Sequence, residues 1–320
     1  MPKRNFIIIY YRSIKEKVGG SGRLLRLVKC IGADFIDNIF VNNIFFRNIF
    51  VYIFQISIVA LITLRKLKEI LAKDVIIFQS LSLPAGIFIA ISKALRKEKI
   101  ILDDFNFHSK TDYILFKLFS HFISEVWTSS FYSIIYLRNV CKNSIKIKYV
   151  PTPLFISDNV KYAKRNIILY VSSKSFPRYV AIGKKICRIA EKFPIYTFLI
   201  VGTVCEDLEK DPSCFRDNVK LLGLVSETSL DKLLRIAKYL VVFDTEHYIY
   251  PGGMLIKIVD AVEHHVIPII SYQFRYSFPF IKFIYTFEDL EKAITKGISI
   301  DFYFLRKIYG CERIRKIINE

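Results

Sequence analysis

The sequence is poor in several features that mark other classes of protein. Its six cysteines are scattered, and none forms a C-x-x-C pair, which argues against a zinc module and against a dense disulfide framework. We therefore expect free, buried thiols in a reducing compartment. The patterns G-x-S-x-G, H-E-x-x-H and the Walker loop are absent. No long polar low-complexity tract occurs, which argues against disorder.

Acidic residues are scarce relative to basic ones. The chain has 29 Asp and Glu against 48 Lys and Arg, for a formal net charge of +19. Such a charge favours polyanionic partners: nucleic acid, an anionic membrane surface or phosphorylated small molecules. Charge alone does not choose among these three. The 320 residues suffice for two domains, and 52% hydrophobic content supports sizeable cores.

Long uncharged runs are also few, and the clearest covers residues 48–64 with basic residues on both sides. Seventeen residues are at the lower limit for crossing a bilayer. We interpret the run as a buried helix; a helix lying on a membrane surface is the alternative, and a true span is the least favoured. No secretory signal opens the chain, because residues 5–11 have the character of a strand. We expect a cytoplasmic protein that can also associate with the cytoplasmic face of a membrane.

Apolar strands alternate with helical segments along both halves of the chain. Strands are predicted at residues 6–11, 74–79 and 99–103, and again at 166–172, 197–202, 240–243 and 267–271. This alternation is typical of parallel, doubly wound sheets in an α/β protein. Pro151 and Pro153 interrupt the pattern. We therefore predict one Rossmann-like domain over residues 1–153 and a second over 154–320, whose last helix can pack back on the first.

The most informative stretch covers residues 218–271 and reads strand, turn, helix, strand, glycine loop, helix, strand. Gly252 and Gly253 follow an apolar strand and lead into a helix that carries Lys257 and Asp260. Glycines at such a turn let backbone N–H groups approach an anion, and the helix N-terminus adds partial positive charge. The sequence therefore predicts a diphosphate site here, although an ordinary turn with a surface lysine would look similar.

Two further groups of residues that could bind phosphate follow predicted strands. Lys174 and Arg178 come after the first strand of the second half, where cations can balance the charge that grows on a departing diphosphate. A solvated basic loop is the alternative. In the first half, Gly19 and Gly20 precede a helix predicted from residue 23, although a flexible surface loop would look the same.

Two residues in the first half are candidates for catalysis. Asp104 and His108 follow the strand at 99–103. Either could orient an acceptor hydroxyl or take its proton. The alternative is a solvated loop.

These stretches resemble the family 4 (group 1) glycosyltransferases. The sequence NVKLLGLVSETSLDKLLRIAKYLVV is similar to the family's strand, G-x-V turn, helix and strand, and GGMLIKIVDAVEHHVIPIIS is similar to its G-x-x-x-K-x-x-E-A-x-x-x-G-x-P-V-I run. The resemblance implies the GT-B fold, with two Rossmann-like domains facing across a cleft. It also implies a nucleotide-sugar in the second domain, an acceptor in the first, and retaining transfer without a metal.

The resemblance assigns roles to individual residues. It implies that Asp260 holds the ribose hydroxyls of the nucleotide, where a carboxylate accepts two hydrogen bonds. Gly19 and Gly20 stand where the family has a glycine loop beside the bound phosphates. Gly252 replaces one of the family's two glutamates, and His265 replaces its usual glycine.

The leading hypothesis is a glycosyltransferase that moves a sugar from a nucleotide-sugar to a glycan, lipid-linked or protein acceptor, with no cofactor and no metal. Three alternatives stay open. A nucleic-acid-binding protein is disfavoured because the basic residues are spread through every predicted helix. An inactive GT-B scaffold is motivated by Gly252 in place of an acid. A GT-B-like sugar epimerase would call for more acidic and histidine residues than the predicted site offers.

Overall fold

The structure is a computed structural model of the 320-residue chain. It describes residues 6–9, 19–36, 72–78, 89–90, 93, 99–103, 110–129, 131–141, 145–156, 165–172, 176–242, 256–271, 283–284, 287–297 and 299–319. Among the described helices, none is long and apolar enough to span a bilayer. The uncharged run at residues 48–64 lies outside the described residues.

The chain divides into two compact units. The first unit comprises Met1–Pro153 together with Cys311–Glu320, and the second comprises Leu154–Gly310. The described elements of the first unit are β1 (Phe6–Ile9), α1 (Gly19–Ile31), β2 (Asp34–Ile36), β3 (Val75–Phe78), β4 (Lys99–Asp103), α4 (Lys110–Phe119), the 3-10 turn η2 (Ser120–Phe122), β5 (Glu125–Thr128), α5 (Phe131–Cys141), β6 (Lys146–Tyr149) and α12 (Cys311–Asn319).

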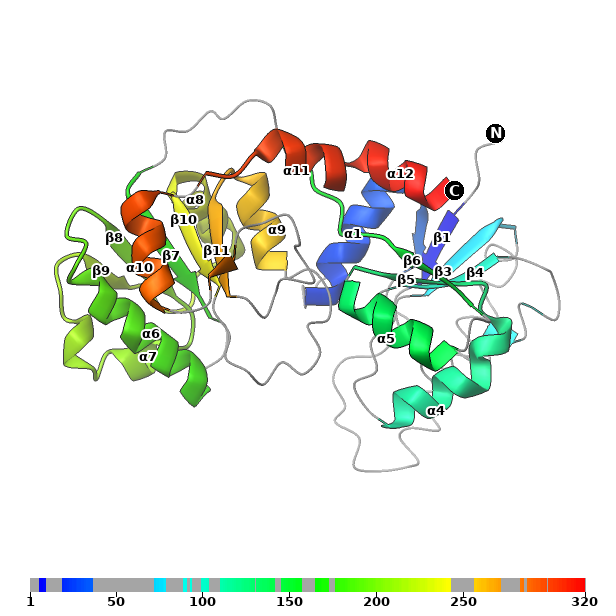
Figure 1. The fold of residues 1–320 in the computed structure, drawn as a ribbon, viewed down its shortest axis with the longest axis horizontal. Coiled ribbons are helices and arrows are strands. Elements are labelled where there is room, and N and C mark those ends of the chain that lie inside the picture. Colours follow the sequence, from blue (N-terminus) through cyan, green and yellow to red (C-terminus); the bar gives the residue numbers. More distant parts are fainter. Residues whose placement is uncertain are drawn as a thin grey trace. The chain divides into compact units, whose positions relative to one another are not determined.

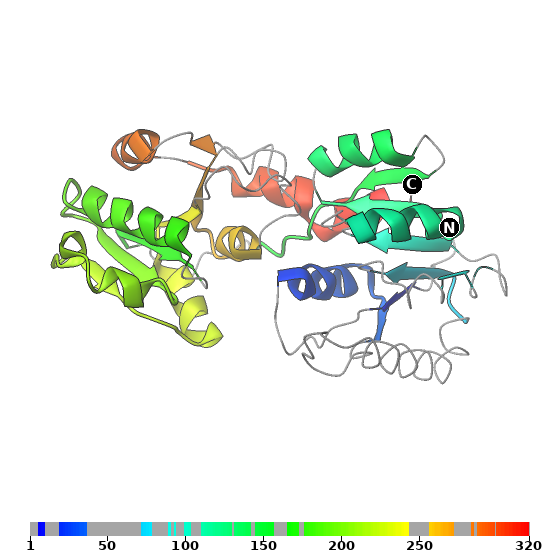
Figure 2. The same ribbon diagram turned by 90° about the horizontal axis from the view of Figure 1, so that it is seen from below.

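The first unit is built on a six-stranded sheet of order β2-β1-β3-β4-β5-β6, in which every described pairing is parallel. The order reverses between β1 and β3. Because crossovers between parallel strands are right-handed, the connection from β1 to β2 and the connections from β4 to β6 place their helices on opposite faces. Figure 1 and Figure 2 accordingly show α1 on one face of the sheet and α4 with α5 on the other.

The C-terminal helix α12 belongs to the first unit and is held there by two polar contacts. Arg315 Nε donates to the Cys30 carbonyl of α1 at 2.6 Å. Lys148 Nζ on β6 donates to the Ile317 carbonyl at 3.3 Å. The chain therefore returns to its first unit after completing the second.

The second unit repeats the architecture. Its described elements are β7 (Ile167–Val171), α6 (Pro177–Ala190), β8 (Thr197–Val201), α7 (Cys205–Leu208), the 3-10 turn η3 (Pro212–Cys214), β9 (Val219–Leu221), α8 (Glu227–Ile236), β10 (Tyr239–Val242), α9 (Ile256–Glu263), β11 (Ile267–Ser271), β12 (Phe283–Ile284), α10 (Phe287–Lys296) and α11 (Phe302–Tyr309). The sheet order is β12-β11-β10-β7-β8-β9, again with parallel pairings.

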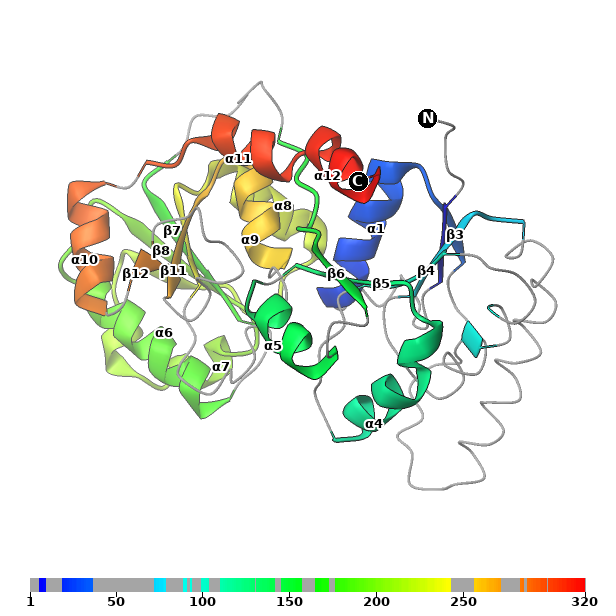
Figure 3. The same ribbon diagram turned by 45° about the vertical axis from the view of Figure 1, so that its right-hand side comes forward.

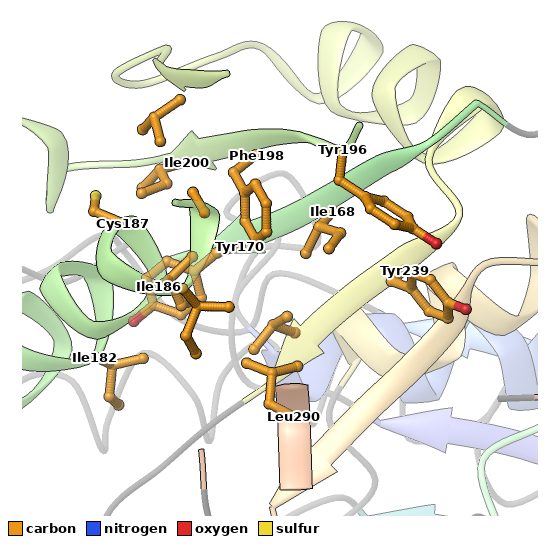
Figure 4. Close-up of a cluster of buried hydrophobic side chains, with 14 of the residues drawn as sticks. Ile168, Tyr170, Ile182, Ile186, Cys187, Tyr196, Phe198, Ile200, Tyr239 and Leu290 are labelled. Atoms are coloured by element: carbon orange, nitrogen blue, oxygen red, sulfur yellow. The ribbon is translucent and has the colours of Figure 1, made fainter. Parts of the chain in front are cut away.

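A hydrophobic cluster forms between this sheet and helices α6, α7 and α10. Figure 4 shows Phe198 of β8, Tyr239 of β10, Ile186 of α6 and Leu290 of α10 among its members. Helices cover both faces of a parallel sheet, so its strands are nearly continuous apolar runs. This explains why β7 and β8 read IILYV and TFLIV rather than alternating polar and apolar residues.

Local signals fix the N-terminus of α8 and the C-terminus of α9. Ser226 is the N-cap of α8, and its hydroxyl accepts a hydrogen bond from the Ser229 amide at 3.2 Å. Helix α9 ends in a left-handed turn at His265, whose φ is 55°. The Val266 amide reaches back to the Ala261 carbonyl at 2.8 Å there, which is the Schellman arrangement that usually carries glycine. His265 thus adopts a backbone conformation that favours glycine.

The expectation of free thiols is wrong for two of the six cysteines. Cys187 of α6 and Cys214 of η3 form a disulfide across a separation of 27 residues. No sequence pattern marks this pair, because the fold alone brings α6 beside η3. Among the described cysteines, Cys30, Cys205 and Cys311 are free.

Candidate functional site

The candidate site lies at the carboxyl edge of the second sheet, where the strand order reverses. Strand β7 continues to β8 on one side, and its neighbour β10 continues to β11 on the other. In open α/β sheets, ligands bind outside the carboxyl ends of the strands at such a switch point. The segments that the sequence singled out follow these two strands: Lys174 and Arg178 come after β7, and Gly252, Gly253 and Lys257 come after β10.

Lys257 connects the two strand ends directly. It is exposed, in the first turn of α9. Its Nζ donates a hydrogen bond of 2.9 Å to the carbonyl oxygen of Val171, the last residue of β7. The ammonium that follows β10 in the chain is therefore held at the carboxyl end of β7.

Arg178 lies at the N-terminus of α6, directly after Pro177. Its guanidinium carbon is 4.7 Å from the centre of the Tyr179 ring and 5.8 Å from that of Phe176. Nη2 also donates to the Tyr179 hydroxyl at 3.0 Å. These contacts restrain the cation at a helix N-terminus, where the amide groups and the helix dipole also favour an anion.

Asp260 lies one turn after Lys257 on α9 and is half-buried. Its backbone carbonyl is 2.7 Å from His264 Nδ1, and His264 Nε2 is 2.6 Å from Asp231 Oδ1 on α8. Burial raises the pKa of the Asp231 carboxyl, but hydrogen bonds from Arg235 and His264 outweigh it and bring that pKa below its usual value. The imidazole thus ties α9 to α8 and fixes the turn that carries Asp260.

Sequence reasoning missed a close backbone contact beside this edge. Gly202, after β8, has φ of +117°, and a Cβ built on it would lie 1.7 Å from the Ser172 carbonyl oxygen that follows β7. The Gly202 amide donates to the Gly223 carbonyl at 2.7 Å. Only glycine fits here. The one available signal was a glycine directly after an apolar strand.

In the first unit, Gly19 and Gly20 form the first residues of α1, so the helix starts four residues earlier than predicted. The first amides of a helix have no acceptor within the helix. The amides of Gly19 and Gly20 could therefore still bind a phosphate, as the sequence suggested. One turn later, Arg23 is buried and forms a bidentate pair with Asp103, the last residue of β4, with Nη2–Oδ1 at 2.6 Å and Nε–Oδ2 at 3.0 Å. The start of α1 therefore lies at the carboxyl end of β4, which Asp104 follows directly.

The structure thus places some predicted site residues and leaves others undetermined. Arg178, Lys257 and Asp260 belong to the carboxyl edge of the second sheet, and Gly19 and Gly20 belong to that of the first. The remaining predicted site residues lie outside the described residues: Asp104, His108, Lys174, Gly252 and Gly253.

No protein-family model and no curated protein sequence matches the chain. Solved structures do match it. The galactosyltransferase WaaB of the lipopolysaccharide outer core is similar with a TM-score of 0.66 at 13% identity, over 98% of both chains. UDP-GlcNAc 2-epimerase from Neisseria meningitidis gives 0.58 at 12% identity, also over 98% of both chains. Staphylococcus aureus TarM gives 0.52 at 12% identity, over 77% of this chain and 54% of TarM.

The chain therefore spans about half the length of TarM and nearly all of WaaB and the epimerase. At sequence identities this low, the structural similarity establishes the fold alone. Two parallel sheets in series, each with helices on both faces, agree with these matches. The chain has the α/β architecture of the GT-B fold, with two Rossmann-like units.

Proposed function

We propose that the chain is a glycosyltransferase that uses a nucleotide-sugar and holds its diphosphate at the carboxyl ends of β7 and β10. The observation that carries the proposal is the hydrogen bond of Lys257 to the Val171 carbonyl, which sets a cation at the switch point. Arg178 adds a second restrained cation at a helix N-terminus. TarM was solved with UDP and the epimerase with UDP-GlcNAc, which supports nucleotide binding by this architecture.

The proposed chemistry needs cations because the leaving diphosphate gains negative charge as the glycosidic bond breaks. Lys257, Arg178 and Lys174 would stabilise that charge, and the amides of Gly252 and Gly253 would bind phosphate oxygens. Asp260 would accept hydrogen bonds from the ribose. Asp104 and His108, after β4 of the first unit, would orient the acceptor hydroxyl. As in the family 4 enzymes that the sequence resembles, transfer would retain the anomeric configuration and need no metal.

We further propose a glycan, lipid-linked or protein acceptor, with the reaction on the cytoplasmic side of a membrane. The excess of basic residues supports an anionic surface as a partner. A lipid-linked sugar is the acceptor that such a surface would present.

Release of the nucleoside diphosphate from UDP-, GDP- and ADP-glucose, with and without a bacterial lipid extract as acceptor, tests the proposal. We expect release from one donor. Arg178→Ala should lower kcat/KM at least about tenfold, since a hydrogen bond to a charged group contributes about 1.5–3 kcal/mol. Arg188→Ala, which alters an exposed arginine in the last turn of the same helix, is the control. Binding of a donor without any release would instead favour the inactive scaffold.

A second candidate is a sugar epimerase, because the Neisseria meningitidis enzyme matches 98% of this chain. An epimerase would convert a nucleotide-sugar without any acceptor. Chromatography of the sugar after incubation with UDP-GlcNAc alone distinguishes the two: a new epimer supports the epimerase, and an unchanged sugar supports the transferase.

A further inference from the structure

Two helices of the first unit expose large apolar side chains in a regular pattern. Ile114 and Leu118 of α4 are 62% and 57% exposed, and Phe131 and Ile135 of α5 are 37% and 59% exposed. Each pair is four residues apart, so its members lie on one face of their helix. Other residues of the same helices, such as Phe116, are buried in the core, and the Phe131 ring also stacks on Tyr149 of β6 with ring centroids 4.1 Å apart.

Basic residues share these faces. Lys117 and Arg138 are exposed and lie three residues after Ile114 and Ile135 respectively. Helix α5 contains no acidic residue, and Asp112 is the one acid in the sequence of α4. Each helix therefore presents two apolar side chains beside one cation, the composition of helices that lie in a lipid interface.

The two faces belong to one side of the sheet. Strands β4, β5 and β6 are consecutive neighbours, so right-handed crossovers place α4 and α5 on the same side. Figure 1 and Figure 3 show the two helices next to each other. We call the combined surface the α4–α5 face, made up of Ile114, Lys117, Leu118, Phe131, Ile135 and Arg138.

We propose that the α4–α5 face docks the protein on an anionic lipid surface. Its apolar side chains would enter the boundary between headgroups and acyl chains, and its cations would bind lipid phosphates. A second copy fits less well, because a twofold contact through this face would bring together two surfaces that both carry Lys117 and Arg138. A nucleic acid would leave Ile114, Leu118 and Ile135 without apolar partners.

The inference deepens the proposed function, since it rests on that proposal for the membrane-bound acceptor. Docking itself is a property of the α4–α5 face and is measured without a sugar donor. The two proposals can therefore fail separately.

Co-sedimentation of the full chain with vesicles of phosphatidylcholine, with and without phosphatidylglycerol, tests the docking. We expect binding to the anionic vesicles that weakens as salt is raised. Leu118→Ser with Ile135→Ser should weaken binding at least about tenfold, given ~0.8 kcal/mol per buried methylene. Ile195→Ser with Leu224→Ser is the control, because these side chains of the second unit are 73% and 71% exposed outside any helix.

A charge variant, Lys117→Gln with Arg138→Gln, leaves the apolar side chains in place. At about 1 kcal/mol per basic residue, it should weaken binding to anionic vesicles roughly 20-fold or more and lower the salt dependence of binding. Either variant alone suffices to test the proposal if the other does not fold.

Three results would overturn docking: no binding of the wild-type chain to anionic vesicles, equal binding by wild type and both variants, or a solution dimer that the Leu118→Ser, Ile135→Ser variant dissociates. In each case nucleotide-sugar binding by the wild type would be unaffected. Conversely, vesicle binding without any binding of a nucleotide-sugar would reject the proposed function and leave the docking surface intact.

Discussion

Single positions at the strand ends decide how closely the backbone segments of the second unit approach one another. Gly202 combines φ of +117° with a position where a Cβ would meet the Ser172 carbonyl at 1.7 Å. Gly223 also has positive φ, +61°, but a Cβ there would meet nothing within 4 Å. Gly223 lies in the left-handed region that other residues can enter at a modest cost, whereas φ at Gly202 lies outside it, so the two glycines differ in backbone conformation as well as in steric space.

This contrast predicts unequal costs for the same substitution. Gly202→Ala should lower the free energy of unfolding by about 3 kcal/mol or more, because strain and a backbone clash combine. Gly223→Ala should cost only about 1 kcal/mol, the conformational penalty alone. Urea unfolding of both variants measures the difference, and equal losses would show that the contact between Gly202 and Ser172 is not tight.

A second single-residue effect concerns acid stability. Hydrogen bonds from Ser213 and Lys184 lower the pKa of Asp211 from 3.8 to about 2. A carboxyl whose pKa is depressed on folding contributes stability above its unfolded pKa and loses it as pH falls towards the folded pKa. Between pH 3.8 and about 2, the urea midpoint of the wild type should therefore fall more steeply than that of Asp211→Asn. Asparagine keeps the acceptor that caps η3, so parallel pH profiles would contradict this account.

Individual residues were predictable from sequence only where chemistry was local. Lys257 was singled out because it follows a strand and a glycine pair, and the structure places it at the carboxyl edge of the sheet. Its role in phosphate binding stays a prediction. The pairing of Arg23 with Asp103 was not predictable, because the two are 80 residues apart and no local pattern marks them.

Helices and strands of the first unit are tied together by that buried pair. Arg23 of α1 bonds Asp103 of β4 and also donates to Thr152 Oγ1, at 3.3 Å, in the segment that leads to the second unit. All three residues are at most 2% exposed. A buried guanidinium that loses its carboxylate keeps an uncompensated charge. Removing one partner of such a pair therefore costs far more stability than the intact pair provides.

Asp103→Asn should accordingly lower the free energy of unfolding by about 3–5 kcal/mol. The matched control is Lys192→Met. It breaks an ion pair of similar length, 2.8 Å, between Lys192, two residues after the end of α6, and Glu291 of α10, and the lysine side chain is 61% exposed. Its cost should stay below about 1 kcal/mol. Differential scanning calorimetry compares the two, and a loss below about 1 kcal/mol for Asp103→Asn would show that the guanidinium is compensated elsewhere.

Elements were predicted well in kind and less well in extent. The alternation of apolar strands and helices identified β3, β4, β7, β8, β10 and β11. One helix start was predicted too late, because α1 begins at Gly19 rather than at residue 23. The disulfide of Cys187 with Cys214 depends on packing that no residue spacing encodes.

Across the chain, the fold was predictable because both sheets follow the same rule. Each is parallel and each reverses its strand order, between β1 and β3 in one unit and between β7 and β10 in the other. Apolar runs and intervening helices imply such sheets from sequence alone. Their strand order is not encoded locally, so the sequence could not show that Lys257 reaches the end of β7.

The central claim is that the carboxyl ends of β7 and β10 hold the diphosphate of a nucleotide-sugar. Isothermal titration of UDP, GDP and ADP into wild type, Lys257→Ala and Lys220→Ala tests it most directly, with Lys220 an exposed lysine of the edge strand β9. One diphosphate should bind the wild type and the Lys220 variant equally. It should bind Lys257→Ala at least about tenfold more weakly, because a charge-assisted hydrogen bond is lost. Undiminished binding by Lys257→Ala, or no binding of any diphosphate to the wild type, would contradict the account.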